Sequence, residues 1–243
     1  MKKKTAKTAA ATAPTARAAN KKSYERIQVA ALSLFAENGV EPTSIRDIGT
    51  KAKVPTSLLY HYAPSKLQLV FDLMSDGMER YQESASDSRA LGTSPEERLA
   101  GLIMAHIIMH CRNSQLAKLI GNGWRPLPKK EKEIMLEVRD NYSRLWDEVL
   151  RDGERSGVFH FENLHLARLS IVQMCSVSAW YSSAGPLSAQ ELVMHFGDLV
   201  FATVRATRQG KALRFNQIKN PAYEDVLAIV EQHHRGAVFG RKR

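Results

Sequence analysis

The chain has 243 residues, a net charge of +10 and two cysteines, Cys111 and Cys175. A chain of this length can bury a sizeable core, either as one large domain or as a small and a larger one. Two cysteines provide no disulfide framework, and no apolar run approaches the roughly 18 residues that a membrane span needs. We therefore expect a globular, cytoplasmic protein with no membrane partner.

The basic excess lies at the two ends of the chain. Residues 1–22 carry seven Lys and Arg side chains and no acid, residues 205–243 carry nine basic and three acidic ones, and residues 71–204 have a net charge of −4. The first segment lacks the apolar stretch of a secretory signal, although its acid-free, Ala- and Arg-bearing composition is shared with transit peptides. We expect a disordered basic arm over 1–22 and a basic extension over 205–243. Such ends suit a polyanion such as DNA, or are solvated tails.

Three short helices are predicted between residues 23 and 68. The first has Ser23 as its N-cap, and the second begins at Ser44, with Asp47 placed to complete a capping box. Pro55 suits the first turn of the third helix. Three short helices joined by tight turns have the size of a helix-turn-helix unit, whose second motif helix enters the major groove of DNA.

Helical periodicity continues from residue 69 to residue 204. It is interrupted by a polar stretch over 83–93 and by a loop at Gly121, Gly123 and Pro126, and it resumes after Ser94, Pro128, Asn163 and Ser188. The helix that follows Asn163 is expected to extend to Ala179. After residue 204 the pattern decays, with one more helix expected over 221–232. No β-hairpin signal is found, so the expected fold is all-α, with nine or ten helices.

Residues 26–66 resemble the DNA-binding domain of the TetR family of bacterial regulators. The matching elements are AA-x-x-LF-A-x-x-G, T-S-I-R-D-I, L-Y-x-Y and P-S-K, in this order across all three helices. The family usually has A-G-V-S in the turn before the third helix, where this chain has Ala52-Lys53-Val54-Pro55, so Lys53 stands where glycine would adopt a left-handed backbone. Ala63 stands where Phe is common. These departures concern the operator sequence rather than the domain.

Seven polar side chains are predicted to contact DNA. Hydroxyls at a helix N-terminus suit a phosphate, short polar groups on the third helix suit base edges or phosphates, and the aromatic and basic groups that follow suit the phosphate backbone. In chain order, the predicted contacts are Thr43, Ser44, Thr56, Ser57, Tyr60, His61 and Lys66. Ser44 has the alternative role of capping its helix, and Leu59 and Tyr62 are expected to pack inside the domain. The resemblance implies the same contacts.

The resemblance also implies that residues 69–204 form a ligand-binding and dimerisation domain. In the family the last two helices usually build a four-helix bundle with a second copy, and the matching pair here is 163–179 and 189–204. Four segments are similar to TetR-type repressors of fatty-acid and sterol breakdown, which respond to acyl-CoA thioesters. They are Arg139-Asp140-Asn141-Tyr142, Gly157-Val158-Phe159, Trp180-Tyr181 and Gly185-Pro186-Leu187-Ser188. We therefore expect a homodimeric repressor that binds a pseudo-palindromic operator and is released by a small-molecule effector.

An acyl-CoA effector needs basic groups for its phosphates and an apolar channel for its acyl chain. The predicted pocket residues are Met104, Ile108, Met109, Arg125, Arg139, Tyr142, Trp146, Met174 and Trp180, with Arg112 and Lys118 as further basic groups. The alternative interpretation of the Met and aromatic residues is an ordinary hydrophobic core. A TetR-type regulator that senses another apolar or cationic compound, and an architectural DNA-binding protein, are the other functions that the sequence leaves open.

No enzymatic chemistry is predicted. The chain has no nucleophile elbow, no phosphate-binding glycine loop and no clustered carboxylates, so we expect no catalytic residues and no cofactor. His106 and His110 lie four residues apart and can face one way on a helix, which is a spacing that can hold a metal. No acid stands at a supporting position nearby, so we expect core or pocket histidines and no metal site.

Overall fold

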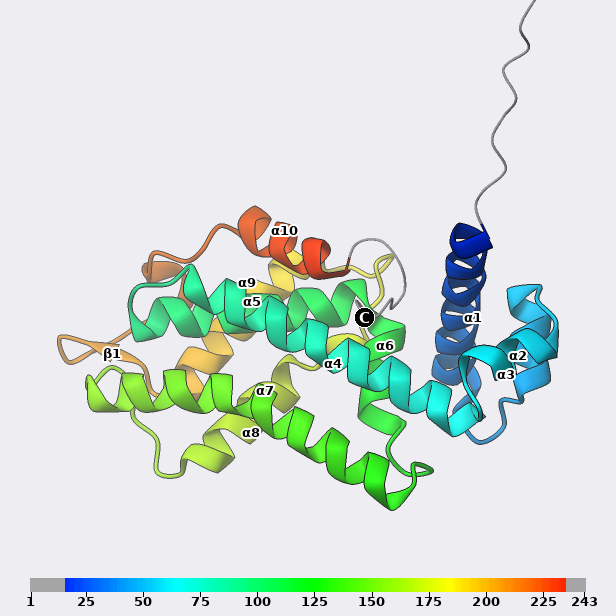
Figure 1. The fold of residues 1–243 in the computed structure, drawn as a ribbon. Coiled ribbons are helices and arrows are strands. Elements are labelled where there is room, and N and C mark those ends of the chain that lie inside the picture. The colour runs from blue at the N-terminus through cyan, green and yellow to red at the C-terminus, as the bar shows by residue number, and fades with distance from the viewer. Residues whose placement is uncertain (1–15, 235–243) are drawn as a thin grey trace, which may run out of the picture.

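The computed structural model describes residues 16–234 of the chain. Helices α1 to α10 dominate this part, with two 3-10 helices and one very short β-hairpin (Figure 1). The all-α expectation is therefore confirmed. Helices α1 to α3 form a small head at one end, and α4 runs from the head into a larger group made of the remaining helices (Figure 1). No helix in residues 16–234 is long and apolar enough to span a membrane.

The head consists of α1 (Ala16–Asn38), α2 (Ile45–Ala52) and α3 (Thr56–Tyr62). Ser44 and Asp47 make the predicted capping box of α2, and Lys53 adopts the predicted left-handed backbone, with φ 56° and ψ 49°. The prediction that the first helix begins at Ser23 is wrong, because α1 already includes Ala16. Part of the predicted disordered arm is thus helical, as its good helix formers allow. Residues 1–15 of that arm lie outside the described residues.

Helix α4 (Lys66–Ala90) connects the head to the larger group. With 25 residues it is roughly 37 Å long. The predicted break over residues 83–93 is wrong, since α4 continues to Ala90. The charged residues Glu83 and Asp87 of this stretch lie on the exposed face, whereas Ser84, Ala85 and Ser88 face the interior. At Gly101 a Cβ would lie 2.3 Å from the Ser88 carbonyl oxygen, so only glycine allows α4 and α5 to approach this closely.

Helix α5 (Pro95–Arg112) is the centre of the larger group, and all its residues from Leu99 to His110 are buried. Around it lie α6 (Ser114–Asn122), α7 (Lys129–Arg155), α8 (Leu164–Cys175), the 3-10 helix η1 (Val177–Ala179) and α9 (Ala189–Thr203). Gly121 belongs to α6, not to the predicted loop. Helix α8 ends at Cys175, four residues before the predicted end at Ala179. Directly after this end, the Ser176 hydroxyl donates to the Val172 carbonyl at 2.8 Å.

Residues 205–234 fold onto the larger group, and residues 235–243 lie outside the described part of the chain. The folded segment contains β1 (Thr207–Arg208), β2 (Lys211–Ala212), the 3-10 helix η2 (Phe215–Gln217) and α10 (Tyr223–His234). The β1–β2 hairpin contradicts the expectation of no hairpin. The buried side chains of Phe215, Val226 and Val230 show that residues 205–234 of the predicted basic extension pack against the rest of the chain. The predicted helix over 221–232 is confirmed. The Phe215 ring packs directly against Gly197, where an added Cβ would lie 2.4 Å from the ring. Sequence periodicity does not reveal this contact.

Candidate nucleic-acid interface and effector region

Helix α3 presents one polar face to solvent. Thr56, Ser57, Tyr60 and His61 are all exposed, with Tyr60 at 54%, and their spacing of one and four residues places them on the same side of the helix. On the opposite side Leu59 is buried and anchors the helix. Four of the predicted DNA contacts therefore lie together on an accessible helix face, and their contact with DNA remains a prediction.

The first two predicted contacts have structural roles in the turn before α2. Thr43 is buried, and its hydroxyl donates to the Gly39 carbonyl at 2.8 Å, so the prediction that this hydroxyl meets a phosphate is wrong. Ser44 is exposed, but its hydroxyl donates to Asp47 at 2.6 Å and accepts from the Asp47 amide at 3.1 Å. The Ser44 hydroxyl and the Ser44 backbone amide, which donates to the same carboxylate at 2.9 Å, both lower the pKa of the Asp47 carboxyl. A carboxylate therefore already occupies this helix N-terminus.

Lys66 closes the same turn onto α4. Its Nζ atom donates to the carbonyls of Val40, Glu41 and Thr43 at 2.7, 2.9 and 2.8 Å. A lysine ammonium has three donors, so these bonds use all of them. The predicted phosphate contact of Lys66 is therefore wrong for the arrangement seen here, and the residue instead fixes the head to α4.

Two exposed cations of the head were missed by the sequence analysis. Arg46 lies in the first turn of α2, and Lys53 lies in the turn that leads to α3. Lys53 was noted only for its backbone, although an exposed lysine beside a helix that is predicted to contact DNA is itself a candidate for a phosphate contact. Both exposed side chains add positive charge to the head.

A buried polar cluster lies in the larger group. His106 contacts the Tyr142 hydroxyl through Nδ1 at 2.7 Å and the Ser176 hydroxyl through Nε2 at 3.2 Å, and His110 contacts the Ser178 hydroxyl at 3.2 Å. Burial holds the pKa of His106 well below its ordinary value and lowers that of His110 to about 4. Both rings are therefore neutral near pH 7. They lie 4.4 Å apart, and residues 16–234 contain no group of three or more metal-ligating side chains.

The predicted pocket residues separate into three sets. Met104, Ile108, Met109, Tyr142 and Trp146 are buried together in the interior, and Met174 is half-buried against it. Trp180 is 58% exposed and lies over the Phe196 ring at 6.1 Å, so it does not belong to this buried set, and its place in a ligand pocket stays a prediction. The third set is Arg125 and Arg139, which are both exposed.

Arg125 and Arg139 line one open cleft between the end of α6 and α7. The cleft has a volume of about 620 Å³, and its other lining residues are Gly121, Asn122 and Trp124. The Arg139 guanidinium lies over the Trp124 ring, 5.6 Å from its centroid. Trp124 was not predicted. A flat ring beside two guanidinium groups can hold a ligand that combines a heterocycle with phosphates.

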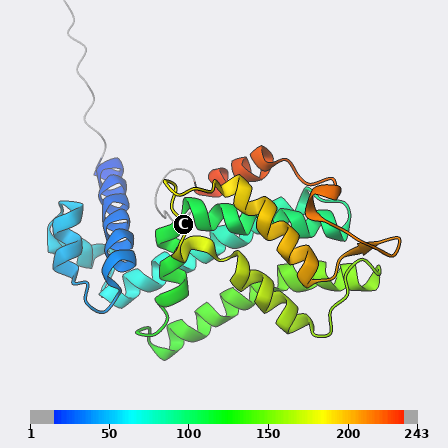
Figure 2. The ribbon, with the colours of Figure 1, turned by 180° about the vertical axis from the view of Figure 1, so that it is seen from behind.

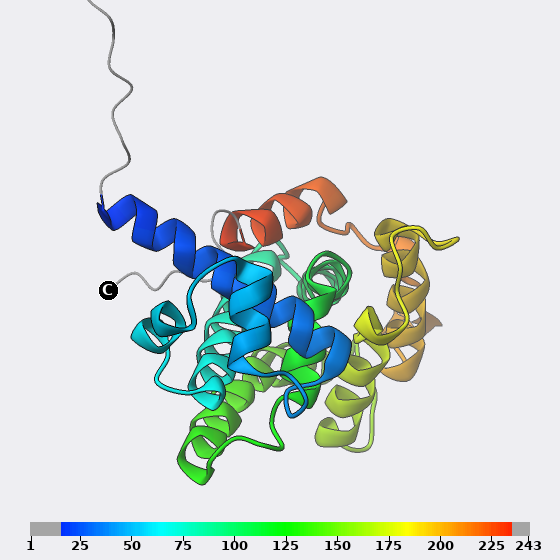
Figure 3. The ribbon, with the colours of Figure 1, turned by 90° about the vertical axis from the view of Figure 1, so that its right-hand side faces the viewer.

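The outer faces of α8 and α9 are apolar. Among the described residues, these helices and their connection carry six of the eleven exposed large hydrophobic side chains. The six are Leu166, Leu169, Trp180, Leu187, Met194 and Leu199, and we call them the apolar patch. Helices α8 and α9 lie together on one side of the molecule in the views from behind and from the head (Figures 2 and 3).

Comparisons with known proteins identify the family. Residues 27–73 match the family model described as bacterial regulatory proteins, tetR family, and residues 92–204 match the tetracyclin repressor-like, C-terminal domain. The HTH-type transcriptional repressor KstR2 of Mycolicibacterium smegmatis is 30% identical over 198 residues, covering 77% of this chain and 92% of that protein. The chain belongs to the TetR family. It is a helix-turn-helix transcriptional repressor of this family, as the sequence analysis predicted.

Solved structures of TetR-family proteins share the fold. KstR2 of Mycobacterium tuberculosis, described as a ketosteroid transcriptional regulator, superposes with a TM-score of 0.70 at 24% identity, over 78% of this chain and 97% of that one. AibR, solved in complex with isovaleryl coenzyme A and operator DNA, superposes with a TM-score of 0.68 at 20% identity, over 76% and 100% of the two chains. At these identities the likeness extends to the fold alone.

Proposed function

We propose that this TetR-family repressor acts as a homodimer that binds a pseudo-palindromic operator through two copies of α3 and leaves it when an acyl-CoA binds. Residues 23–68 would form the DNA-binding domain and residues 69–204 the effector and dimerisation domain. The observation that carries the DNA-binding part is the accessible polar face of α3, supported on the inside by Leu59. This role requires no catalytic residue and places the protein in the cytoplasm, where operator DNA lies.

The apolar patch on α8 and α9 supports the homodimer. Exposed apolar side chains that gather on two adjacent helices favour an interface over solvent contact. A two-fold axis through this patch would pair α8 and α9 with their copies and hold two heads at a fixed separation. Paired heads suit two half-sites, which one small helix-turn-helix unit cannot read with typical specific affinity.

Three observations support an acyl-CoA as the effector. The KstR2 relative is described as a ketosteroid regulator, the AibR structure contains isovaleryl coenzyme A, and a fatty acid metabolism regulator of Bacillus subtilis is 24% identical over 134 residues. The cleft at Trp124, Arg125 and Arg139 suits the adenine and phosphates of CoA. The buried set around Met104 and Trp146 suits an acyl chain once the helices separate.

Helix α4 is the proposed coupling element, because one continuous helix joins the head to the effector domain (Figure 1). It packs against α6, which also contacts α1 of the head. The effector must bind the DNA-free arrangement better than the DNA-bound one, since equal affinity shifts nothing. A coupling of about 1–3 kcal/mol would lower operator affinity about 5- to 150-fold.

The test is a gel-shift titration on DNA from upstream of the protein's own gene. Long-chain and ring-bearing acyl-CoAs should release the DNA and raise the melting temperature, whereas the free acids and CoA alone should do neither. Arg139→Gln should raise the acyl-CoA concentration required, and Arg144→Gln, an exposed arginine five residues along α7, is the matched control. If no acyl-CoA displaces DNA or stabilises the protein, the effector belongs to another apolar or cationic class.

A further inference from the structure

Two buried hydrogen-bond donors of the effector domain have no acceptor among residues 16–234. They are the Tyr81 hydroxyl on α4 and the Trp146 indole N–H on α7, and the two residues are 3% and 0% exposed. Burial raises the pKa of the Tyr81 phenol, so this hydroxyl keeps its proton. A buried donor without a partner carries the full cost of its desolvation. A molecule that supplies an acceptor to these groups would therefore bind favourably.

The two donors belong to the buried polar cluster around His106 and His110. The Tyr81 ring lies 6.1 Å from the His110 ring, and the Trp146 ring lies 5.8 Å from the His106 ring, measured between ring centroids. The two histidine rings are 4.4 Å apart. Helices α4, α5 and α7 thus bring the donors to one region of the interior, with one donor beside each histidine.

His106 sets the direction of the hydrogen bonds in this cluster. The Ser176 hydroxyl donates its proton to the Val172 carbonyl, so it accepts from His106 Nε2. The neutral imidazole then has its lone pair on Nδ1, which accepts from the Tyr142 hydroxyl at 2.7 Å. Burial raises the pKa of Tyr142, and the Trp146 N–H partly offsets this rise without reaching hydrogen-bond geometry. These side chains satisfy one another and leave the two donors unpaired.

The Ser84 and Ser88 hydroxyls on the same face of α4 are also buried and unpaired. Their requirement is local, because a serine hydroxyl can turn to the carbonyl group four residues earlier in its own helix. A phenol or an indole holds its donor far from its own backbone and has no such alternative. Tyr81 and Trp146, unlike the serines, therefore need an acceptor from elsewhere.

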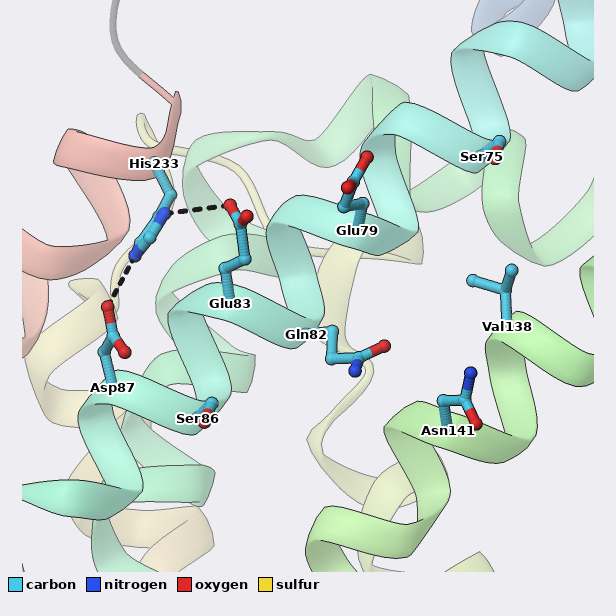
Figure 4. A pocket seen from close by; sticks show the side chains of 9 residues that line it. All are labelled: Ser75, Glu79, Gln82, Glu83, Ser86, Asp87, Val138, Asn141 and His233. Carbon is cyan, nitrogen blue, oxygen red and sulfur yellow. Dashed lines mark hydrogen bonds and ion pairs between the residues drawn. The ribbon is translucent and has the colours of Figure 1, made fainter. Parts of the chain in front are cut away.

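An open groove of about 710 Å³ lies between α4 and α7 (Figure 4). It is lined by Gln82, the neighbour of Tyr81, and by Asn141, the neighbour of Tyr142. Successive helix residues differ in direction by about 100°, so the groove lies on a side of these two helices that adjoins the polar cluster. The α4 side of the groove also carries three carboxylates, which repel phosphates and admit a neutral group. They belong to Glu79, Glu83 and Asp87.

We propose that Tyr81 and Trp146 bind a carbonyl group of the effector, whose acyl part enters the interior through the groove between α4 and α7. A carbonyl oxygen has two lone pairs and no hydrogen, so it can accept from either donor. A hydrocarbon would leave both donors unpaired, and a protonated amine would bring further donors to a neutral cluster. The assignment of this carbonyl to an acyl-CoA rests on the proposed function, whereas the preference for a carbonyl group does not.

The experiment uses three bicyclic compounds of the same shape with the full-length protein, in the absence of DNA. They are decalone, a ketone, its parent hydrocarbon decalin, and the corresponding primary amine, which is a cation at neutral pH. Decalone should move the indole N–H signal of Trp146 in the NMR spectrum, and decalin should not move it in the same direction. The chain has three tryptophans, so Trp124→Phe and Trp180→Phe assign the signals. The amine should not raise the melting temperature.

Tyr81→Phe removes one of the two donors. It should weaken decalone binding about 2- to 10-fold and leave decalin binding unchanged, because one neutral hydrogen bond is lost. The melting temperature of the free variant should not fall, since the hydroxyl has no partner to lose. Tyr223→Phe, a half-buried tyrosine on α10, is the matched control and should change neither affinity.

Matched CoA compounds identify the source of the carbonyl. Tyr81→Phe should weaken decanoyl-CoA but not its thioether analogue S-decyl-CoA if the thioester carbonyl is bound, and should weaken only a keto-decanoyl-CoA if a ketone on the chain is bound. The proposal is overturned if neither decalone nor decalin binds, if Tyr81→Phe affects both equally, or if the Trp146 signal does not respond to decalone. The donors then serve an internal water. A decalone response without DNA release by any acyl-CoA would instead contradict only the proposed effector.

Discussion

The head and the C-terminal segment, residues 205–234, differ in how far apart in the sequence their contacting residues lie. In the head, Ser44 bonds Asp47 three residues later and Thr43 bonds Gly39 four residues earlier. In the C-terminal segment, Phe215 packs against Gly197, and Arg80 bonds His233 across 153 residues. Local signals therefore reveal the head, whereas the C-terminal segment is recognisable only once the chain has folded.

The largest expected effect is a loss of operator affinity caused by substitutions in the apolar patch, which leave the structure of the head unchanged. Leu166→Glu combined with Leu199→Glu places two charges in the apolar patch and should convert the proposed dimer to a monomer. With the head intact, operator affinity should still fall about 100-fold or more, because one half-site is lost. Analytical ultracentrifugation and fluorescence anisotropy measure the two effects.

The matched control for this pair is Leu136→Glu. Leu136 is an exposed leucine on α7, outside the apolar patch, with 41% of its surface accessible. It should change neither the oligomeric state nor the operator affinity. A double variant that remains dimeric would show that the dimer forms through another surface.

The second effect tests whether the head is held by Lys66. Lys66→Met removes three charge-assisted hydrogen bonds to the turn before α2 and should lower the free energy of unfolding by about 2 kcal/mol without any DNA present. Lys51→Met breaks an exposed ion pair with Glu37 and should cost less than about 1 kcal/mol. Denaturant titration of both variants provides the comparison. Equal stability of Lys66→Met and the native chain, with a reduced salt dependence of DNA binding, would restore the phosphate contact predicted from the sequence.

Most of the fold could be predicted from the sequence, because caps and periodicity are local. Ser44, Ser65, Ser94, Asn163 and Ser188 all cap the helices that follow them. The errors have tertiary causes. The polar residues in 83–93 predict an interruption of the helix, although the buried residues between them hold α4 against α5.

The candidate site shows the same limit. The exposed side chains of α3 follow from helical spacing, so Thr56, Ser57, Tyr60 and His61 were predictable as one face. The bonds of Lys66 depend on carbonyl groups 23 to 26 residues earlier in the head, which no residue pattern records. The residue type of Trp180 makes it a predicted pocket residue, yet its position on the surface depends on the end of α8 at Cys175.

The third effect is the pH dependence of the free energy of unfolding that two buried histidines cause. His106 and His110 are buried and neutral, with the pKa of His110 lowered to about 4, so unfolding in acid lets both rings take up protons. Stability should be fully present above about pH 6.5 and should fall as the pH drops toward 4, by up to about 1.4 kcal/mol per pH unit for each histidine. Denaturant titrations of the native chain and of His110→Gln between about pH 4.5 and pH 7 measure it, and an unchanged slope in the variant would contradict the assignment.

The smallest effect separates the residues of α3 that hold the phosphate backbone from those that read bases. Tyr60→Phe removes one exposed hydroxyl and should weaken every operator variant equally, about fivefold, because one hydrogen bond contributes about 1 kcal/mol. Ser57→Ala should instead change the preference among operator variants, since a short polar group on this face suits base edges. Tyr223→Phe, a half-buried tyrosine at the start of α10, is the control for the loss of a phenol far from DNA. Anisotropy titrations against a set of single-base operator variants, with unfolding curves in parallel, distinguish the two roles. If Tyr60→Phe alters sequence preference and Ser57→Ala does not, the roles of the two residues on α3 must be exchanged.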